Sequence, residues 1–239
     1  MSDLDLFAWG TGWGDELAYG LLVTFEAAIA GYGLGLLIGL ATAYAELSRS
    51  KALRWLAKGY GLVFRSVPEL LIIFLFYYGG AFVLRALLSP FGVGRIDLSA
   101  FAAGVAALAV IQSAYASQIF RGAILAVPRA MVEAALSLGL HRWQVQLKVT
   151  LPLALRYAFG GLVNLWVNAI KTTPLLAAIG LEDFVRAADK AGQNTKAYFA
   201  FFAVILVVYL ALSAATLWLQ RRYGERLFRH LGPLAGERR

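Results

Sequence analysis

Residues 17–45 read LAYGLLVTFEAAIAGYGLGLLIGLATAYA, an apolar stretch in which Glu26 is the one charged residue. A helix rises about 1.5 Å per residue, so a segment of this length exceeds the roughly 30 Å of hydrocarbon in a bilayer. The stretch is therefore typical of a transmembrane helix. It decides the fold class, which we predict to be an all-α membrane protein.

Four further stretches along the chain have the length and apolar character of a membrane span. We place them near residues 68–88, 98–119, 151–170 and 198–219. The whole sequence is 60% hydrophobic and only 15% charged, whereas a soluble domain has about 25% charged residues. We therefore predict one polytopic domain over residues 1–239, with five transmembrane helices.

The charged residues predict which way the chain crosses the membrane. The segment before the first span holds Asp3, Asp5, Asp15 and Glu16 but no Lys or Arg, while basic residues gather in three later segments. These are Arg49, Lys51, Arg54, Lys58 and Arg65; Arg121, Arg129, Arg142, Lys148 and Arg156; and Arg221, Arg222, Arg226, Arg229, Arg238 and Arg239. The positive-inside rule makes these segments cytoplasmic, so the N-terminus lies outside and the tail over 220–239 lies inside. The net charge of +8 follows this pattern, and we predict no nucleic-acid partner.

Several kinds of chemistry have no support in the sequence. There is no cysteine, and His141 and His230 lie far apart, so we predict neither a disulfide nor a metal site. The GxxxxGK[ST] loop that cradles nucleotide phosphates is missing, so this chain does not hydrolyse ATP itself. We predict no enzymatic activity and no cofactor within this chain.

The loop between the third and fourth spans is too polar to cross a membrane but has helical spacing. Its sequence over residues 127–156 is VPRAMVEAALSLGLHRWQVQLKVTLPLALR. Pro128 suits the first turn of a helix, Gly139 suits its end, and Pro152 is expected to open the next span. Apolar residues recur on one side of the helix at Met131, Ala134, Ala135 and Leu138. An amphipathic helix resting on the membrane surface explains this periodicity as well as a docking helix does.

The same loop carries a longer motif. Glu133-Ala134-Ala135 is followed by Gly139, Val149 and Leu151-Pro152 at the spacing EAA-x3-G-x9-I-x-LP, with valine at the isoleucine position. This segment resembles the EAA loop of binding-protein-dependent ABC importers. The resemblance implies a type I ABC importer transmembrane fold. It also implies a coupling helix within about residues 127–150 that docks on an ATP-binding subunit.

Motifs elsewhere in the chain extend this resemblance to the polar amino acid permeases. They are Thr24–Ala27, Phe64–Leu70 and Phe120–Ala123, and Ile179–Asp183 followed by Ala188 and Ala191-Gly192 is similar to the Q-type subunits of histidine/lysine-arginine-ornithine and opine transporters. The resemblance implies transport of polar, basic amino acids or opines. It further implies a second, M-type permease subunit, a dimer of subunits that bind ATP-Mg, and a periplasmic substrate-binding protein.

Five polar residues are candidates for the substrate pathway. A carboxylate inside a span costs about 2.5–3.5 kcal/mol on insertion scales, so Glu26 should face protein or water, either as a packing group or as a pathway residue. Thr172 and Thr173 precede Pro174, where the helix should break, and Gly180 allows another turn. Beyond that turn, Glu182 and Asp183 offer carboxylates to a cationic amino acid, although acids at the start of a helix have the same pattern.

Two local features invite structural explanations. Ser66-Val67-Pro68-Glu69 fits a capping box. Gly31, Gly33, Gly35 and Gly39 predict close helix packing, either within the subunit or between two subunits.

Two other classes of membrane protein are the alternatives to an importer subunit. An ion-gradient-driven transporter favours inverted repeats and several ionisable residues inside the spans, and a non-transporting scaffold does not need the loop motif.

Overall fold

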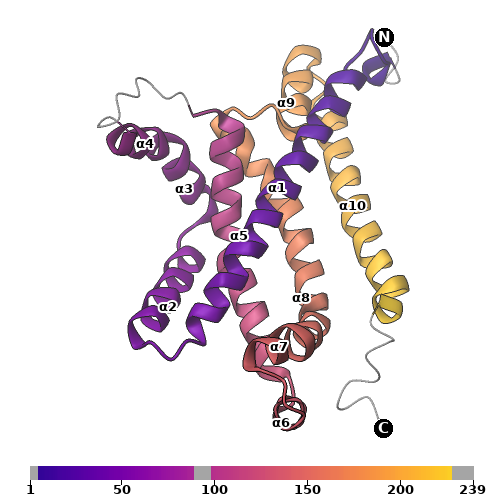
Figure 1. The fold of residues 1–239 in the computed structure, drawn as a ribbon. Helices are drawn as coiled ribbons and strands as arrows, with labels where there is room; N and C mark the ends of the chain where they lie inside the picture. The colour runs from indigo at the N-terminus through magenta and orange to yellow at the C-terminus, as the bar shows by residue number, and fades with distance from the viewer. Residues whose placement is uncertain (1–4, 89–97, 228–239) are drawn as a thin grey trace.

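The computed structural model describes residues 5–88 and 98–227, and these residues form a bundle of helices (Figure 1). Five of the helices have the length and hydropathy to cross a membrane: Gly14–Glu46, Glu69–Ala86, Ala100–Ala126, Arg142–Ile179 and Tyr198–Gly224. The five spans predicted from the sequence are thus confirmed. The predicted tail beyond residue 227 lies outside the described residues.

The bundle is built around α1 (Gly14–Glu46) and α5 (Ala100–Ala126), with α8 (Leu151–Thr172) and α10 (Tyr198–Leu227) on one side (Figure 1). Most residues in the middle of α5 are buried, whereas few residues of α10 are buried. A long apolar helix with an exposed surface is stable only where its surroundings are also apolar, as in lipid or against another membrane subunit.

Three glycines explain how closely α1 and α5 approach. A Cβ built on Gly31, Gly35 or Gly39 would lie only 2.6–2.8 Å from a side-chain atom of α5. The atoms in question belong to Leu108, Gln112 and Ala116 respectively. Gly33, the remaining glycine of the run, meets no atom within 4 Å. The predicted close packing is therefore made by the other three glycines and lies within this chain, between its first and third spans.

The connection expected after the first span is a helix, α2 (Lys51–Ser66). Ser50 caps it by accepting a hydrogen bond from the N–H of Leu53. The Tyr60 hydroxyl contacts Ser113 and the Val110 carbonyl, which lie near the middle of α5. Arg65, which the sequence predicts to lie in a cytoplasmic basic segment, is exposed in the last turn of α2. Its Nε donates to the Gly61 carbonyl at 2.7 Å.

The predicted capping box at Ser66–Glu69 is wrong. Ser66 is the last residue of α2, and the next helix, α3 (Glu69–Phe74), has Pro68 at its cap position with no side-chain hydrogen bond. The cause is Pro68, which disfavours helical backbone at Val67 and so separates the two helices. After α3 the chain continues through a π-helical turn, Leu75–Gly79, into α4 (Gly80–Leu88).

The fourth span begins earlier than predicted. A short helix, α7 (Arg142–Val145), passes through a π-helical turn, Gln146–Thr150, directly into α8, so Leu151 and Pro152 lie inside one continuous helix. Proline has no N–H, and its ring crowds the carbonyl four residues earlier. The wider π turn just before Pro152 accommodates both effects.

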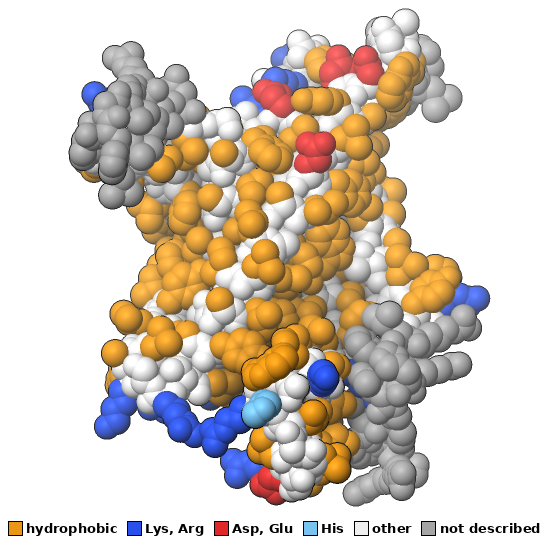
Figure 2. Space-filling view, in the orientation of Figure 1, with side chains coloured by type: hydrophobic (Ala, Val, Ile, Leu, Met, Phe, Trp, Pro, Cys, Tyr) orange, Lys and Arg blue, Asp and Glu red, His pale blue; other side chains and the backbone are white. Residues whose placement is uncertain are grey.

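The two ends of the bundle differ in charge, and we name them accordingly. The acidic end carries α9 (Phe184–Thr195), and the basic end carries α6 (Arg129–Ser137) and α7 (Figure 1). In Figure 2, Lys and Arg side chains gather along the lower, basic end, and most of the Asp and Glu side chains lie at the upper, acidic end.

Candidate functional site

The loop at the basic end forms the helix that its sequence predicts. Val127 and Pro128 interrupt the chain after α5, and α6 follows. Gly139 ends α6 with a left-handed backbone, φ +84°. The N–H of Gly139 bonds to the Leu136 carbonyl and that of Leu140 to the Ala135 carbonyl, which is the hydrogen-bond pattern of a Schellman motif.

Most of α6 is exposed. Ala135 is its one buried residue, whereas Glu133, Ala134 and Met131 are exposed and Leu138, just after the helix, is 84% exposed. Met131, Ala134 and Leu138 keep the three- and four-residue spacing of one helix face. In Figure 1, α6 lies beyond the lower end of the bundle, past α7. An exposed apolar face on a projecting helix is a surface suited to a protein partner.

At the acidic end, the chain turns sharply between the fourth span and α9. Helix α8 ends at Thr172, a 3-10 segment with Pro174 follows over Thr173–Ile179, and Gly180 ends that segment at φ +87°. The break near Thr172–Pro174 and the turn at Gly180 therefore lie where the sequence predicts them. Gly180 uses the same pair of hydrogen bonds as Gly139, from its own N–H to Ala177 and from the next N–H to Leu176.

Asp183 is fully buried and caps α9. Its Oδ1 accepts from the N–H of Arg186 at 2.9 Å, and its Oδ2 has no hydrogen-bond partner among the described residues. The next N–H, of Phe184, donates to the Thr24 hydroxyl of α1 at 3.1 Å. Burial raises the pKa of the Asp183 carboxyl to about 7. Asp183 is thus a helix cap held between α1 and α9, with no exposed surface in this conformation.

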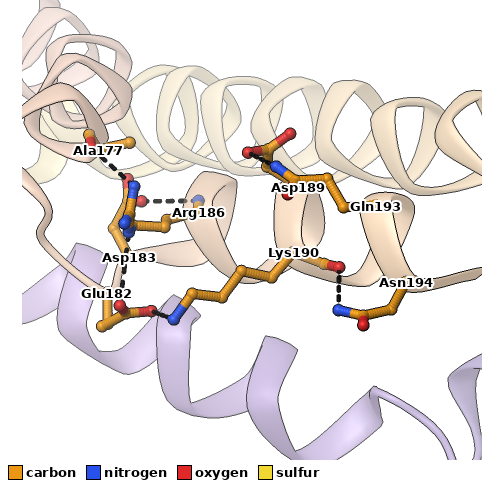
Figure 3. A network of polar contacts seen from close by, with 8 residues as sticks. All are labelled: Ala177, Glu182, Asp183, Arg186, Asp189, Lys190, Gln193 and Asn194. Carbon is orange, nitrogen blue, oxygen red and sulfur yellow. Dashed lines mark hydrogen bonds and ion pairs between the residues drawn. The ribbon is translucent and has the colours of Figure 1, made fainter.

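Glu182, in contrast, lies half-exposed at the centre of a charge network on α9 (Figure 3). Its Oε2 accepts from Lys190 Nζ at 2.6 Å, and its Oε1 lies 3.4 Å from Arg186 Nε. The hydrogen bond from Lys190 lowers the pKa of Glu182. Arg186 also donates to the Ala177 carbonyl, which links α9 to the segment before Gly180.

Glu26 and Glu182 line one cleft at the acidic end. This cleft has a volume of about 410 Å³ and lies between α1, the start of α5 and the turn at Gly180. A second cleft of about 610 Å³ shares Tyr19 and Glu182 with it and adds Asp15, Glu16 and Lys190. Glu26 makes no hydrogen bond or ion pair with any described residue. Glu26 shares this cleft with Ala100 and Phe101, the first residues of α5, so it lies toward the acidic end of the bundle and faces a cleft.

The two threonines at the end of α8 are buried and bonded. The Thr172 hydroxyl lies 3.2 Å from Glu69 Oε2 and 3.0 Å from the Asn168 carbonyl. The Thr173 hydroxyl donates to the Ile170 carbonyl and lies 3.3 Å from the Tyr209 hydroxyl of α10. Glu69 thus joins the second span to the fourth. The structure brings Glu26 and Glu182 together, but it places Thr172 and Thr173 in separate, buried contacts.

The sequence does not predict one buried carboxylate, that of Glu46. Glu46 ends α1 and is only 5% exposed; it contacts Gln118 and Arg121 of α5. The available signal was Glu46 itself, which ends an apolar run and is the one acidic residue next to the basic stretch 49–65. Its partners lie more than seventy residues away, so local patterns do not reveal them.

These features define a class: an all-helical, multispanning membrane component with a projecting helix at its basic end. The family of binding-protein-dependent transport system inner membrane components matches residues 35–229, and the chain belongs to this family. Its members are permease subunits of ABC importers.

Individual relatives agree with the resemblance to Q-type subunits. The chain is 41% identical over 217 residues to the nopaline transport system permease protein NocQ of Agrobacterium fabrum, covering 90% of this chain and 92% of the relative. It is 37% identical over 216 residues to the histidine/lysine/arginine/ornithine transport system permease protein HisQ of Escherichia coli, covering 89% and 95%.

Solved structures support the same fold. A crystal structure of an amino acid ABC transporter with histidines matches with a TM-score of 0.76 and 29% identity, over 90% of this chain and 95% of that chain. The MetNI methionine ABC transporter in an inward-facing conformation matches with a TM-score of 0.72 at 18% identity, over 98% and 100%, which supports the fold alone. The predicted ABC importer transmembrane fold is confirmed.

Proposed function

We propose that this chain is the permease subunit of an importer for cationic amino acids or opines, powered by ATP hydrolysis on a separate subunit. The observation that carries the proposal is α6, a short helix beyond the basic end whose apolar face has no partner within the described chain. A helix that only rested on the membrane would not need the EAA spacing. Family membership favours the importer over the ion-gradient transporter and the scaffold.

We assign α6 as the coupling helix. By the positive-inside rule the basic end faces the cytoplasm of a bacterial inner membrane, where an ATP-binding subunit that holds ATP-Mg can meet it. Exposed Ala134 allows close approach, Glu133 offers a carboxylate to a basic residue of the partner, and Gly139 turns the chain away. Buried Ala135 holds α6 to the loop, and Leu151 and Pro152 fix the start of α8.

The assembly that we propose contains two permease subunits, this one and an M-type partner, with a dimer of ATP-binding subunits and a periplasmic binding protein. Nucleotide binding draws the coupling helices together and turns the pathway outward, and hydrolysis returns it inward. Each ligand shifts the equilibrium only through its different affinity for the two states.

The acidic end supports a cationic substrate. Asp15, Glu16, Glu26 and Glu182 line two adjoining clefts there, against one basic residue, Lys190. A cleft with an excess of one sign of charge concentrates ligands of the opposite sign. The relatives' names are consistent with this charge, because lysine, arginine and ornithine are cations at neutral pH.

We assign the pathway residues two kinds of role. Glu26 and Glu182 attract substrate at the acidic end, and Thr172 lies further in, beside Glu69. Thr173 and Asp183 are fully buried, so in this conformation they hold the turn and α9 in place and do not contact substrate.

The proposal is tested by reconstituting the complex of permease, ATP-binding and binding-protein subunits in liposomes. We expect uptake of labelled arginine or an opine that requires ATP on the side of the ATP-binding subunit. Glu133→Lys and Gly139→Trp should abolish this uptake while the subunit still inserts and folds. Gradient-driven uptake by this chain alone, without ATP, would overturn the proposal.

A further inference from the structure

Glu46 is a buried carboxylate at the basic end of the bundle that neither the substrate pathway nor the docking face of α6 uses. It is the last residue of α1, and its side chain is 3% exposed. Gln118 Nε2 of α5 donates to its Oε1 at 2.9 Å, and Arg121 Nε lies 3.4 Å from its Oε2. A buried carboxylate is costly unless it is paired in this way, so its neighbours are held in a defined geometry.

The partner residues lie close in sequence to the coupling helix. Arg121 occupies the last two turns of α5, which ends at Ala126, and α6 starts three residues later at Arg129. Among the described residues α6 contacts mainly its own loop, so force on α6 passes into the bundle through the end of α5 and through α7. A displacement of α5 moves Gln118 and Arg121 together, and with them the Glu46 carboxylate.

The same carboxylate also reaches α2. Gly61 has no side chain at this point, and a Cβ there would lie 3.8 Å from Glu46 Oε1 and 3.5 Å from Arg65 Nη2. The Glu46 carboxylate and the Arg65 guanidinium are therefore no more than about 7 Å apart, a distance at which opposite charges still attract. Glu46 thus lies where α1, α2 and α5 meet, with the Arg121 side chain paired to it and the Arg65 guanidinium nearby.

Helix α2 connects this junction to the second span, which contacts the end of α8 through Glu69. After Arg65 the chain passes Pro68 and reaches Glu69, whose carboxylate meets Thr172 at the end of α8. A shift of α2 relative to α5 consequently changes the position of Glu69. Helices that pack as units and meet at one ionic contact can switch between discrete arrangements.

We propose that Glu46 is a positioning residue that transmits movement of the coupling helix from α5 to α1 and α2. This inference rests on the proposed function, because it presumes that α6 is driven by an ATP-binding subunit. Glu46 contacts neither substrate nor nucleotide. Its role is to make the three helices respond together to a displacement of α5.

The test uses Glu46→Gln in the full reconstituted complex, measuring both ATP hydrolysis and uptake. Glutamine retains the shape and the hydrogen bond from Gln118 but loses the attraction to both guanidinium groups. We expect substrate transported per ATP to fall about fivefold or more, the lower range of a coupling between sites, while hydrolysis continues. Arg121→Gln should give the same loss, and the double variant should be no worse than either, since residues acting through one contact are not additive.

Asp189→Asn is the matched control. Asp189 also accepts from a glutamine amide, that of Gln193 at 2.8 Å, but both residues belong to α9. It should leave the transport-to-ATP ratio unchanged. An unchanged ratio in Glu46→Gln, or uptake and hydrolysis that fall in proportion with the amount of folded complex, would assign Glu46 a purely structural role and overturn the inference. Loss of ATP-driven uptake by the unmodified complex would instead refute the proposed function.

Discussion

The two ends of the molecule carry short helices bounded by the same glycine turn but with opposite surroundings. Gly139 and Gly180 have nearly equal φ angles and matching hydrogen bonds. At the acidic end, α9 buries five residues against α1 and α10. At the basic end, α6 buries one. The same local chemistry therefore yields a helix that stabilises the subunit at one end and a helix that awaits a partner at the other.

The largest effect should come from the docking face of α6. Leu138→Asp places a charge at a side chain that is 84% exposed, so the isolated subunit should keep its thermal stability. Binding to the ATP-binding subunit should weaken by about 2 kcal/mol or more, the loss typical of a residue central to an interface. Copurification with that subunit and thermal unfolding in detergent measure the two effects. Undiminished copurification would show that α6 does not bind the ATP-binding subunit through this face.

The reciprocal change at the acidic end is Ala188→Leu. Ala188 is fully buried in α9, and overpacking a well-packed core costs about 1–3 kcal/mol. We expect a lower unfolding temperature with unchanged affinity for the ATP-binding subunit, the reverse of Leu138→Asp. If this variant instead lost the ATP-binding subunit and stayed stable, the division of roles between the two ends would be wrong.

The stability of the protein should depend on pH through the buried carboxyl of Asp183. Its pKa is raised from 3.8 to about 7 in the folded chain, so the neutral form is favoured on folding. The associated stability is fully present below pH 3.8 and is lost as the pH rises to 7, by up to about 1.4 kcal/mol per pH unit. Asp183→Asn keeps the cap but cannot ionise, so its unfolding temperature should fall less than that of the wild type between pH 5 and 8. Parallel curves for the two proteins would show that the carboxyl does not titrate in this range.

The smallest and sharpest prediction concerns the paired glycines. A Cβ at either Gly139 or Gly180 meets no atom within 4 Å, so alanine adds only the strain of the left-handed backbone, about 1–2 kcal/mol. Gly180→Ala should lower the unfolding temperature, since α9 is part of the packed bundle. Gly139→Ala should leave that temperature unchanged and reduce ATP-driven uptake. Equal thermal shifts in the two variants would mean that α6 is as firmly integrated as α9.

Local patterns in the sequence predict much of this architecture. The five spans follow from apolar length, the α6 loop from its motif, and the breaks near Pro174 and Gly180 from backbone chemistry. What escapes prediction depends on contacts between distant segments. The basic residues of α2 indicate a surface connection, yet α2 is a helix that packs along α5. Glu69 bonds to Thr172, which is 103 residues away in the sequence. Glu46 is buried by partners that are 72 and 75 residues away.

The acidic-end residues show the same division. The sequence offers Glu182 and Asp183 as equivalent carboxylates, yet one is half-exposed and paired with Lys190 while the other is buried at the cap of α9. The two side chains point in different directions because they are successive residues at the start of a helix. Which of them points inward depends on the packing of α1 against this turn, and the sequence does not show that packing.

The central claim, that α6 receives the drive from an ATP-binding subunit, is tested most directly by site-specific crosslinking. The chain has no cysteine, so Ala134→Cys on α6 and Tyr19→Cys at the acidic end each provide a single attachment point for a photoreactive maleimide. In the assembled complex, the probe at position 134 should crosslink to the ATP-binding subunit, and the probe at position 19 should not. Crosslinking to that subunit from position 19, or none from position 134, would contradict the account.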